Sequence, residues 1–434
     1  MASEWPSLLL RDAGVELIDC EHRTPPAAQR GYPYVTIPQL RAGRVDLSDA
    51  RRIAPGHFAD WTRKARPAAY DVVLSRRCNP GETAFVEPGQ EFALGQNLVL
   101  LRADGTRVHP PFLRWLVRGS EWWDQVAKFI NVGAVFDSLR CADVPGFMLP
   151  IPPLQAQRAI AHILGALDDK IELNRRMSET LEAMARALFK SWFVDFDPVR
   201  AKMAGDDQWQ NRILDVFPES IGREDEIPAG WRMQRLGDIV ETRLGGTPSR
   251  AESTYWGGDI PWINSGKAND FRVVEPSEFI TPAGLASSAT TLLPRRTVVI
   301  AITGATLGQV SLLEIETCAN QSVVGVLGSD RLPGEFLFYW VKENIAQLVA
   351  QQTGGAQQHI NKNNVNDLPV LCPSEGAISL YVEHARPMFD RIRQCCFESL
   401  TLARLRDAFL PKLISGELRI KDAERFLSRA GVSA

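Results

Sequence analysis

Apolar residues recur along two long stretches of the chain, in steps that alternate between four and three residues. The first stretch runs from Ile160 to Trp192, and the second runs from Tyr381 to Leu413. A sustained repeat of this kind predicts long α-helices that need a partner along their length. The two helices can satisfy each other, with a small or polar layer around Asn174 fixing their register. The alternative is that each helix is a core helix of its own domain.

The residues that we expect to form the seam between the helices are mostly large and apolar. They are Ile160, Leu164, Leu167, Ile171, Leu181, Leu188 and Trp192 in the first stretch, and Met388, Ile392, Leu402, Phe409 and Leu413 in the second. Two prolines limit the helices. Pro198 predicts that the first helix stops near Asp197. Pro387 disfavours a continuous second helix and predicts a kink or a new start there.

An internal repeat covers most of the chain. Within the helical stretches the offset is 221 residues without a gap, as from Leu181 to Leu402. In the blocks before them, the β-like run 71–74 recurs at 297–300, and Trp5 recurs as Trp231. A period of this length indicates that a whole globule with its helix is duplicated, because solenoid repeats are far shorter.

The blocks that precede the helices mix short Val/Ile runs with Gly, Pro and Asn turns and a few helical stretches, which is typical of α+β globules. We therefore expect an α+β protein with two globular domains and two long helices. The predicted boundaries are 1–150 for the first domain, 151–197 for the first helix, 198–226 for a polar linker, 227–372 for the second domain, 373–420 for the second helix and 421–434 for a C-terminal tail.

Composition narrows the class of protein. The chain is 45% hydrophobic and 23% charged, which favours folded domains over disorder, and its formal net charge is −3. A lone sequence-independent nucleic-acid binder is usually basic. The seven cysteines form no CxxC pair and show no spacing typical of a metal site. Signal-peptide and membrane-spanning patterns are missing, so we expect a reduced, cytoplasmic protein with no membrane partner.

The sequence lacks the motifs of the common enzymes that would suit this length. The nearest approach to a phosphate-binding loop is 264–267, which lacks the first glycine. The run 79–81 approaches the tetrapeptide of amino-methyltransferases, but its glycine removes the likeness. HExxH and GxSxG are also missing. The absence of these motifs from the sequence favours a binding protein with no catalytic residue, metal or cofactor of its own.

Several segments resemble the recurring segments of Type I restriction–modification DNA-specificity subunits. They are LFKSWFVDFDPVRAKM (188–203), IPAGWRMQRLGDI (227–239), GGTPSR (245–250), YWGGDIPWINSGK (255–267) and LRDAFLPKLISGELRI (405–420). The resemblance extends over essentially the whole chain in the order globule, helix, globule, helix. It is strong in the C-terminal half and weaker in the N-terminal globule, which has no GGTPS-like run.

The resemblance implies that each globule is a target-recognition domain that reads one half of a split, asymmetric DNA site. It implies a pseudo-twofold repeat in which the helices form an antiparallel coiled coil and set the spacer between the half-sites. The implied partners are double-stranded DNA, two modification subunits and restriction subunits, and S-adenosylmethionine, ATP and Mg²⁺ would belong to those subunits. Two alternatives are a coiled-coil scaffold that reads no DNA and the specificity part of a Type II-like restriction–methylation enzyme.

Loops that combine polar tips with glycine are the places where we expect contacts to bases, although ordinary turns have the same composition. Gln and Asn match the edge of adenine, and Arg and Lys match guanine. The candidates in the second domain are Asn264, Ser265, Lys267, Thr303, Thr306, Gln352, Gln357, Gln358 and His359. The candidates in the first domain are Arg76 and Arg77, which occupy the repeat positions of Ile302 and Thr303, with Arg41, Arg44 and Gln96.

Overall fold

The computed structural model describes residues 5–133, 136–206, 209, 211–222, 226–350 and 359–429. The chain divides into two compact units, and each unit contains parts of both long helices. Unit 1 comprises residues 1–171 and 401–434, and unit 2 comprises residues 172–400. Each unit is therefore built from one globular domain and from helical segments that lie far apart in the sequence.

Unit 1 contains a six-stranded sheet, a three-stranded sheet and a two-stranded sheet. The strand orders are β2 (Val15–Ile18), β10 (Leu98–Ala103), β7 (Val72–Ser75), β8 (Thr83–Phe85), β5 (Arg44–Val45) and β4 (Leu40–Arg41) in the first, β6 (Arg51–Ile53), β3 (Tyr32–Val35) and β9 (Ala93–Leu94) in the second, and β1 (Ser7–Leu9) with β11 (Met148–Pro150) in the third. The helices of this domain are α1 (Pro55–Trp61), α2 (Pro110–Leu116) and α3 (Ser120–Phe129).

Unit 2 contains a four-stranded, a three-stranded and a two-stranded sheet. The strand orders are β13 (Thr242–Leu244), β19 (Val323–Val326), β16 (Val298–Ala301) and β17 (Val310–Leu312) in the first, β15 (Glu278–Ile280), β14 (Trp256–Ile263) and β18 (Cys318–Ala319) in the second, and β12 (Arg232–Arg235) with β20 (Pro369–Cys372) in the third. Its domain helices are α7 (Leu236–Ile239), α8 (Pro282–Ala286), α9 (Gly334–Ala350) and α10 (Lys362–Asn366).

The predicted duplication is visible in the topology of the sheets. The order β2-β10-β7-β8 in unit 1 corresponds to β13-β19-β16-β17 in unit 2, and β7 and β16 are the strands that the repeat aligns. The parallel pair β3 and β9 likewise corresponds to the parallel pair β14 and β18. All residues of β7 and β16 are buried, because each of these strands pairs with a neighbour on both edges and is covered on both faces. The α+β fold with two domains of one plan is confirmed.

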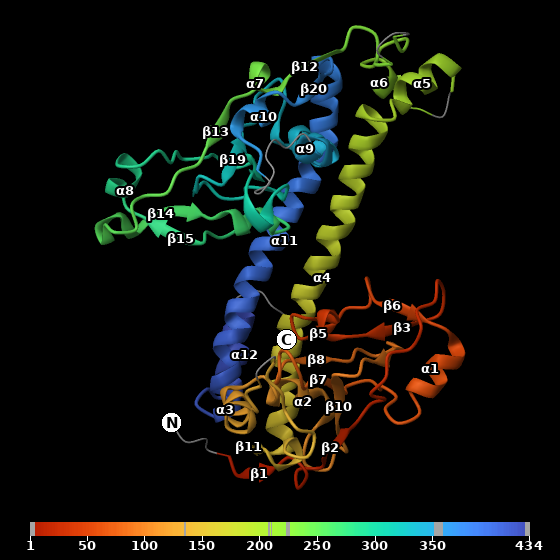
Figure 1. Cartoon of the computed structure of the whole chain (residues 1–434), viewed down its shortest axis with the longest axis vertical. Coiled ribbons are helices and arrows are strands. Elements are labelled where there is room, and N and C mark those ends of the chain that lie inside the picture. The colour runs from red at the N-terminus through yellow and green to blue at the C-terminus, as the bar shows by residue number, and fades with distance from the viewer. Residues whose placement is uncertain are drawn as a thin grey trace. The chain divides into compact units, whose positions relative to one another are not determined.

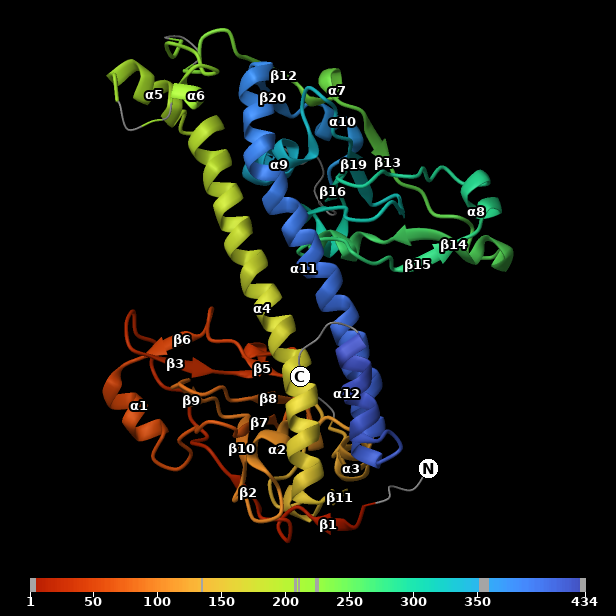
Figure 2. The ribbon, with the colours of Figure 1, turned by 180° about the vertical axis from the view of Figure 1, so that it is seen from behind.

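The two long helices are α4 (Leu154–Phe193) and α11 (Glu375–Ser415), and they lie side by side (Figures 1 and 2). Within unit 2, Trp192 near the end of α4 contacts Tyr381 near the start of α11, with 6.3 Å between the ring centroids. Further along, Asn174 Nδ2 donates a hydrogen bond of 2.8 Å to Glu398. The two segments therefore run antiparallel in this unit.

Burial follows the predicted seam in both helices. In unit 1, Ile160, Leu164 and Leu167 of α4 share one core with Leu402, Phe409 and Leu413 of α11, and Ile171 packs against it. In unit 2, Leu188 and Met388 pack against a core that contains Trp192, while Ile392 is fully buried and Leu181 is half-buried. The heptad spacing works because it keeps one face of each helix turned toward the other.

The expectation that a new helix starts at Pro387 is wrong, because α11 continues through this residue as one helix of 41 residues. Pro387 is exposed, so the carbonyl that loses its hydrogen bond faces water and not the core. Ala385 and Phe389 on either side are buried in the core of unit 2. Their packing holds the backbone helical although the proline disfavours it.

The linker and the tail contain more structure than expected. α4 ends at Phe193, and a new helix, α5 (Asp197–Ala204), begins with Pro198 in its first turn, where the missing N–H has no helical acceptor. A short helix, α6 (Asn211–Leu214), follows. The predicted tail is largely the helix α12 (Ile420–Arg429), and its Ala423 is buried in the core of unit 1.

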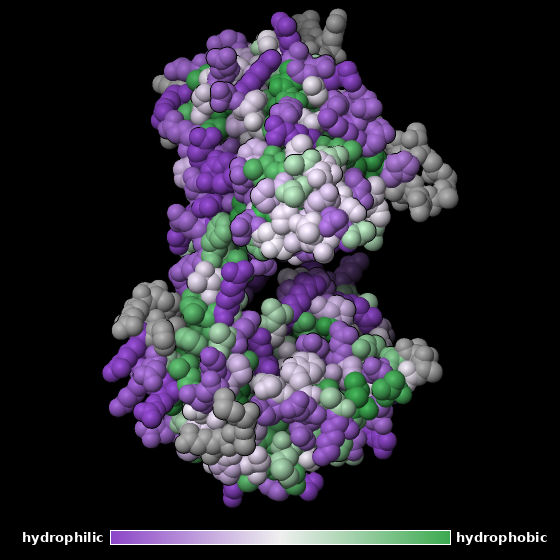
Figure 3. Space-filling view, turned by 90° about the vertical axis from the view of Figure 1, so that its left-hand side faces the viewer, coloured by the Kyte–Doolittle hydropathy of each residue, from purple (hydrophilic) through white to green (hydrophobic). Residues whose placement is uncertain are grey.

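Among the helices of the described residues, none is long and apolar enough to cross a membrane. On the face drawn in Figure 3, hydrophilic residues predominate and hydrophobic residues form small separate groups.

Candidate nucleic-acid interface

Three segments of unit 2 bring predicted contact residues together. The 3₁₀ helix η4 (Ser265–Asn269), which Asn264 caps, packs against β16, β17 and the 3₁₀ helix η5 (Gly304–Thr306). Thr303 precedes η5 and forms an antiparallel bridge with His359. These loops, which are distant in the sequence and were each predicted to contact bases, therefore meet at the end of β16.

The hydrogen bonds of these residues show which of their polar groups are used within the domain. Asn264 Oδ1 accepts the N–H of Gly266 at 2.9 Å, which leaves its amide NH₂ as a donor. Lys267 Nζ lies 3.1 Å from Asp270 and 3.7 Å from Glu275, so two carboxylates offset its charge. Thr306 donates to the carbonyl of Thr303 at 3.3 Å. The surface formed by Asn264, Thr303 and Thr306 is polar and nearly uncharged.

The candidates Gln352, Gln357 and Gln358 lie outside the described residues. His359 is exposed, and the next residue, Ile360, donates its N–H to the carbonyl of Ile302 at 3.1 Å. This backbone hydrogen bond places Ile360 beside the end of β16. Ser265 is half-buried within η4.

In unit 1, Arg76 and Gln96 lie together at the corresponding end of β7. Arg76 donates its N–H to the carbonyl of Gln96 at 3.5 Å, and the same nitrogen lies 3.2 Å from His22 Nδ1. Arg77 lies over the ring of Phe136, with 5.6 Å from its guanidinium carbon to the ring centroid. The Nε atoms of both arginines are buried without a hydrogen-bond partner among the described groups. This surface is cationic, in contrast to the equivalent surface of unit 2.

His22 is the member of this surface that the sequence analysis missed. Its Nδ1 lies 3.2 Å from the carbonyl of Gln96, and its Nε2 lies 2.9 Å from Asp19 Oδ2. Asp19, Cys20 and His22 each have one atom that can bind a metal, and these three atoms lie within 4.8 Å of one another. Burial raises the pKa of the Cys20 thiol to about 12. The CxH spacing directly after β2 is the signal in the sequence that would have identified this loop.

The other two arginine candidates of unit 1 use their charge within the domain. Arg41 is exposed, but it forms ion pairs with Asp46, at 2.8 Å, and with Asp49. Arg44 is half-buried, and it pairs with Glu87, with Asp168 of α4 at 2.8 Å, and with Asp169 at 2.8 Å. These contacts of Arg44 fasten the domain to α4.

Asp168 is the centre of that charged contact. Its side chain is 5% exposed, and Arg44, Arg114 and Arg406 all lie within 3.5 Å of it. Burial by itself would raise the pKa of Asp168, but the positive charges of these three guanidiniums hold it below its ordinary value. Arg406 belongs to α11, so a single carboxylate joins the domain to both long helices.

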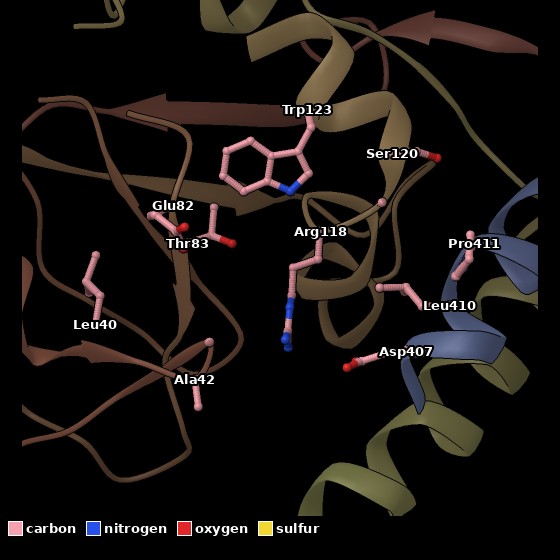
Figure 4. A pocket seen from close by; sticks show the side chains of 12 residues that line it. Leu40, Ala42, Glu82, Thr83, Arg118, Ser120, Trp123, Asp407, Leu410 and Pro411 are labelled. Carbon is pink, nitrogen blue, oxygen red and sulfur yellow. The ribbon is translucent and has the colours of Figure 1, made fainter. Parts of the chain in front are cut away.

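A cavity of about 510 Å³ lies between the domain of unit 1 and the last turns of α11 (Figure 4). Trp123, Glu82 and Asp407 line it, and the side chain of Arg118 extends into it. Burial and the charge of Arg406 lower the pKa of Arg118. No His, Cys or Lys is among the residues that line the cavity, and its polar side chains include the carboxylates of Glu82 and Asp407.

Comparisons with known proteins agree with this geometry. A family model described as "Type I restriction modification DNA specificity domain" matches residues 24–183 and again residues 228–377. The Type I restriction enzyme HindI specificity subunit of Haemophilus influenzae is 25% identical over 399 residues, covering 80% of this chain and 86% of the relative. The MjaIX specificity subunit of Methanocaldococcus jannaschii is 26% identical over 300 residues, covering 68% of this chain and 66% of the relative.

A solved structure shares the fold. The crystal structure of a Type I restriction–modification S subunit from M. genitalium aligns with a TM-score of 0.59 at 15% identity. The alignment covers 95% of this chain and 96% of that chain.

Proposed function

The chain belongs to the Type I restriction–modification DNA-specificity family and is a DNA-specificity subunit, and from this premise we propose how it reads its site. Each domain reads one half of a bipartite, asymmetric DNA sequence with the loops at the end of its central strand, β7 or β16. Unit 1 uses Arg76, Arg77 and Gln96 for this. Unit 2 uses the segments around Asn264, Thr303 and His359.

The observation that carries the proposal is the combination of one sheet topology with two different loop surfaces. Both domains share the plan of strands, and the family model matches both copies. At the end of the central strand, however, unit 1 presents two arginines and unit 2 presents amide and hydroxyl groups. Arginine recognises guanine, whereas Asn matches the edge of adenine. A duplicated scaffold with divergent contact groups is what the reading of two different half-sites requires.

The remaining roles belong to partner subunits in this proposal. Two modification subunits dock on the helical segments, and restriction subunits join the complex. S-adenosylmethionine, ATP and Mg²⁺ bind to those subunits, and the complex works in the cytoplasm. A chain with a net charge of −3 can still bind DNA tightly when its partners supply phosphate contacts.

An exchange of domains tests the proposal. Residues 227–372 are replaced by the matching domain of a relative that keeps aromatic residues where Phe336 and Tyr339 contact Phe189. We expect the methylated sequence to change in one half only, because each domain has its own core and its own contact loops. Sequencing of the methylated genome reports the site.

The matched control is the reciprocal exchange of residues 1–150, which is expected to change the other half. A chimera that changes both halves, or that is active and changes neither, contradicts independent reading by the two domains.

A further inference from the structure

The loop 19–22 of unit 1 carries three groups of the kinds that bind transition metals. We propose that Asp19 Oδ2, Cys20 Sγ and His22 Nε2 bind one Zn²⁺ ion, with water as the fourth ligand. One ligand atom from each residue lies within 4.8 Å of the others, a separation that small side-chain rotations close onto one ion. The ion deepens the proposed function, because the loop it holds lies against Arg76 and Gln96, and in this respect the inference rests on that function.

The outer contacts of Asp19 and His22, on the atoms that would not bind the ion, resemble those of a metal site. A histidine that binds a metal through one ring nitrogen normally donates its other N–H to a carbonyl or a carboxylate. His22 Nδ1 lies 3.2 Å from the carbonyl of Gln96, and Nε2 lies 2.9 Å from Asp19 Oδ2, so the ion takes the place of the proton between these two atoms. Asp19 Oδ1 accepts the N–H of Cys20 at 2.9 Å, so the other oxygen, Oδ2, is the ligand atom. The Cys20 thiol donates to the carbonyls of Gly95 at 3.4 Å and Glu21 at 3.5 Å, and it releases that proton to solvent when it binds the ion.

The ligand set selects zinc among the common cations. Ca²⁺ and Mg²⁺ prefer oxygen ligands, and a thiolate with an imidazole does not suit them. Zn²⁺ is bound tetrahedrally by sulfur, nitrogen and carboxylate oxygen. A thiolate and a carboxylate also neutralise the two positive charges, so the site tolerates the nearby guanidinium. The side chains of Asp19 and His22 are 43% and 47% exposed, which leaves a path for the ion and room for water.

The ion positions Arg76 through Gln96. With zinc on Nε2, the Nδ1 of His22 must carry its proton and donate it to the carbonyl of Gln96. Arg76, whose nitrogen lies 3.2 Å from Nδ1, then loses that acceptor and keeps the carbonyl of Gln96, at 3.5 Å, as its partner on this loop. The position of the guanidinium is thereby tied to a loop that the metal holds rigid. Arg76 is the contact residue, and the zinc ligands are positioning residues.

The test is metal analysis of the full chain, expressed without a polyhistidine tag, loaded with Zn²⁺ and freed of excess metal by gel filtration. The expected result is one zinc per chain for the wild type and loss of the ion in Cys20→Ser and His22→Ala. Co²⁺ loading gives a second signal, because cobalt bound to a thiolate has an intense charge-transfer absorption that Cys20→Ser removes. His22 is exposed, so His22→Ala keeps the test valid if the change at buried Cys20 prevents folding.

Cys372→Ser is the matched control, because Cys372 is a buried free cysteine of unit 2 and is expected to leave the zinc content unchanged. Absence of stoichiometric zinc from the wild type, or its full retention in His22→Ala, overturns the site. Zinc loss without any change in DNA discrimination overturns the positioning of Arg76. Failure of the domain exchange would instead refute the proposed function and leave the zinc content as measured.

Discussion

Asp168 shows how strongly one residue can determine the architecture of a unit. Three guanidiniums converge on this carboxylate, and they come from β5, from α2 and from α11. A buried ion pair adds little net stability when it is intact, but removal of one partner leaves uncompensated charge in the interior. The residue is therefore a sensitive point for the attachment of the domain to both helices.

Asp168→Asn is expected to destabilise unit 1 by about 3–5 kcal/mol, because three cations lose their shared anion in a buried place. Urea unfolding followed by tryptophan fluorescence measures the change. Asp169→Asn is the control, since that side chain is 72% exposed and forms an ion pair with Arg44. Its expected cost is below about 1 kcal/mol. Equal effects of the two changes would show that Asp168 has no central role.

The pKa of Asp168 also predicts the pH dependence of stability. Its folded-state pKa lies below its ordinary value, so the folded state favours the ionised form. The resulting stabilisation is complete above about pH 4, the ordinary range of an aspartate, and is lost as the pH falls through the folded-state pKa. The acid limb of the stability curve is therefore expected to be shallower in Asp168→Asn than in the wild type. Parallel curves below about pH 4 would contradict this.

Arg76 is the residue at which the reading of unit 1 can be tested most directly. Arg76→Gln is expected to remove about 1–3 kcal/mol of discrimination at one base pair of one half-site, because a bidentate contact to guanine is lost. Binding measurements against a set of single-base variants of the site report this. Arg66→Gln is the control, since Arg66 is exposed and pairs with Glu91. A uniform loss over all variants would instead indicate a phosphate contact.

At the scale of the element, we expect the two long helices to set the length of the spacer between the half-sites. Continuous helices of 40 and 41 residues pass from one unit into the other. The bond between Asn174 and Glu398 shows which residues are opposite each other. Insertions at opposite positions lengthen both helices together and keep the heptad seam in phase.

We expect one heptad inserted after Asn174 and one after Phe397 to lengthen the unread spacer of the site by about one to three base pairs. Seven residues add about 10.5 Å of helix, and one base pair rises by about 3.4 Å, so a helix inclined to the DNA adds fewer base pairs. Both half-sites keep their sequences. The methylated sequence of the variant complex is the readout, with a single insertion in α4 as the out-of-register control. An active complex with an unchanged spacer means that the helices serve as a docking surface only.

At the scale of the whole molecule, the chain is organised for recognition. The sequence lacks the common motifs for methyl transfer and nucleotide hydrolysis. We expect the purified chain to transfer no methyl group from labelled S-adenosylmethionine to DNA. Addition of its modification subunit restores transfer. Robust methylation by the chain alone would refute this assignment, and the modification subunit alone provides the control.

The sequence by itself determined the duplication, the two long helices and the family, because these depend on periodic patterns and on contiguous segments. A heptad repeat specifies which face of a helix is buried wherever its partner comes from. Between Ile160 and Trp192 the predicted seam residues are accordingly buried, except for Ile171, Leu181 and Leu188, which are half-buried. The strands β7 and β16 were found in the same way, from short apolar runs at matching places in the repeat.

Only the tertiary structure decided what the charged and polar groups do, because their partners are distant in sequence. The sequence made Arg44 a candidate for DNA contact, but in the structure its guanidinium donates to Asp168, which is 124 residues away. His22 had no visible role until the fold brought the carbonyl of Gln96, 74 residues away, to its ring. Pro387 was expected to kink the second helix or to start it anew, but α11 runs through it between the buried residues Ala385 and Phe389. Electrostatic and packing contacts act through space, so a pattern read along the chain cannot contain them.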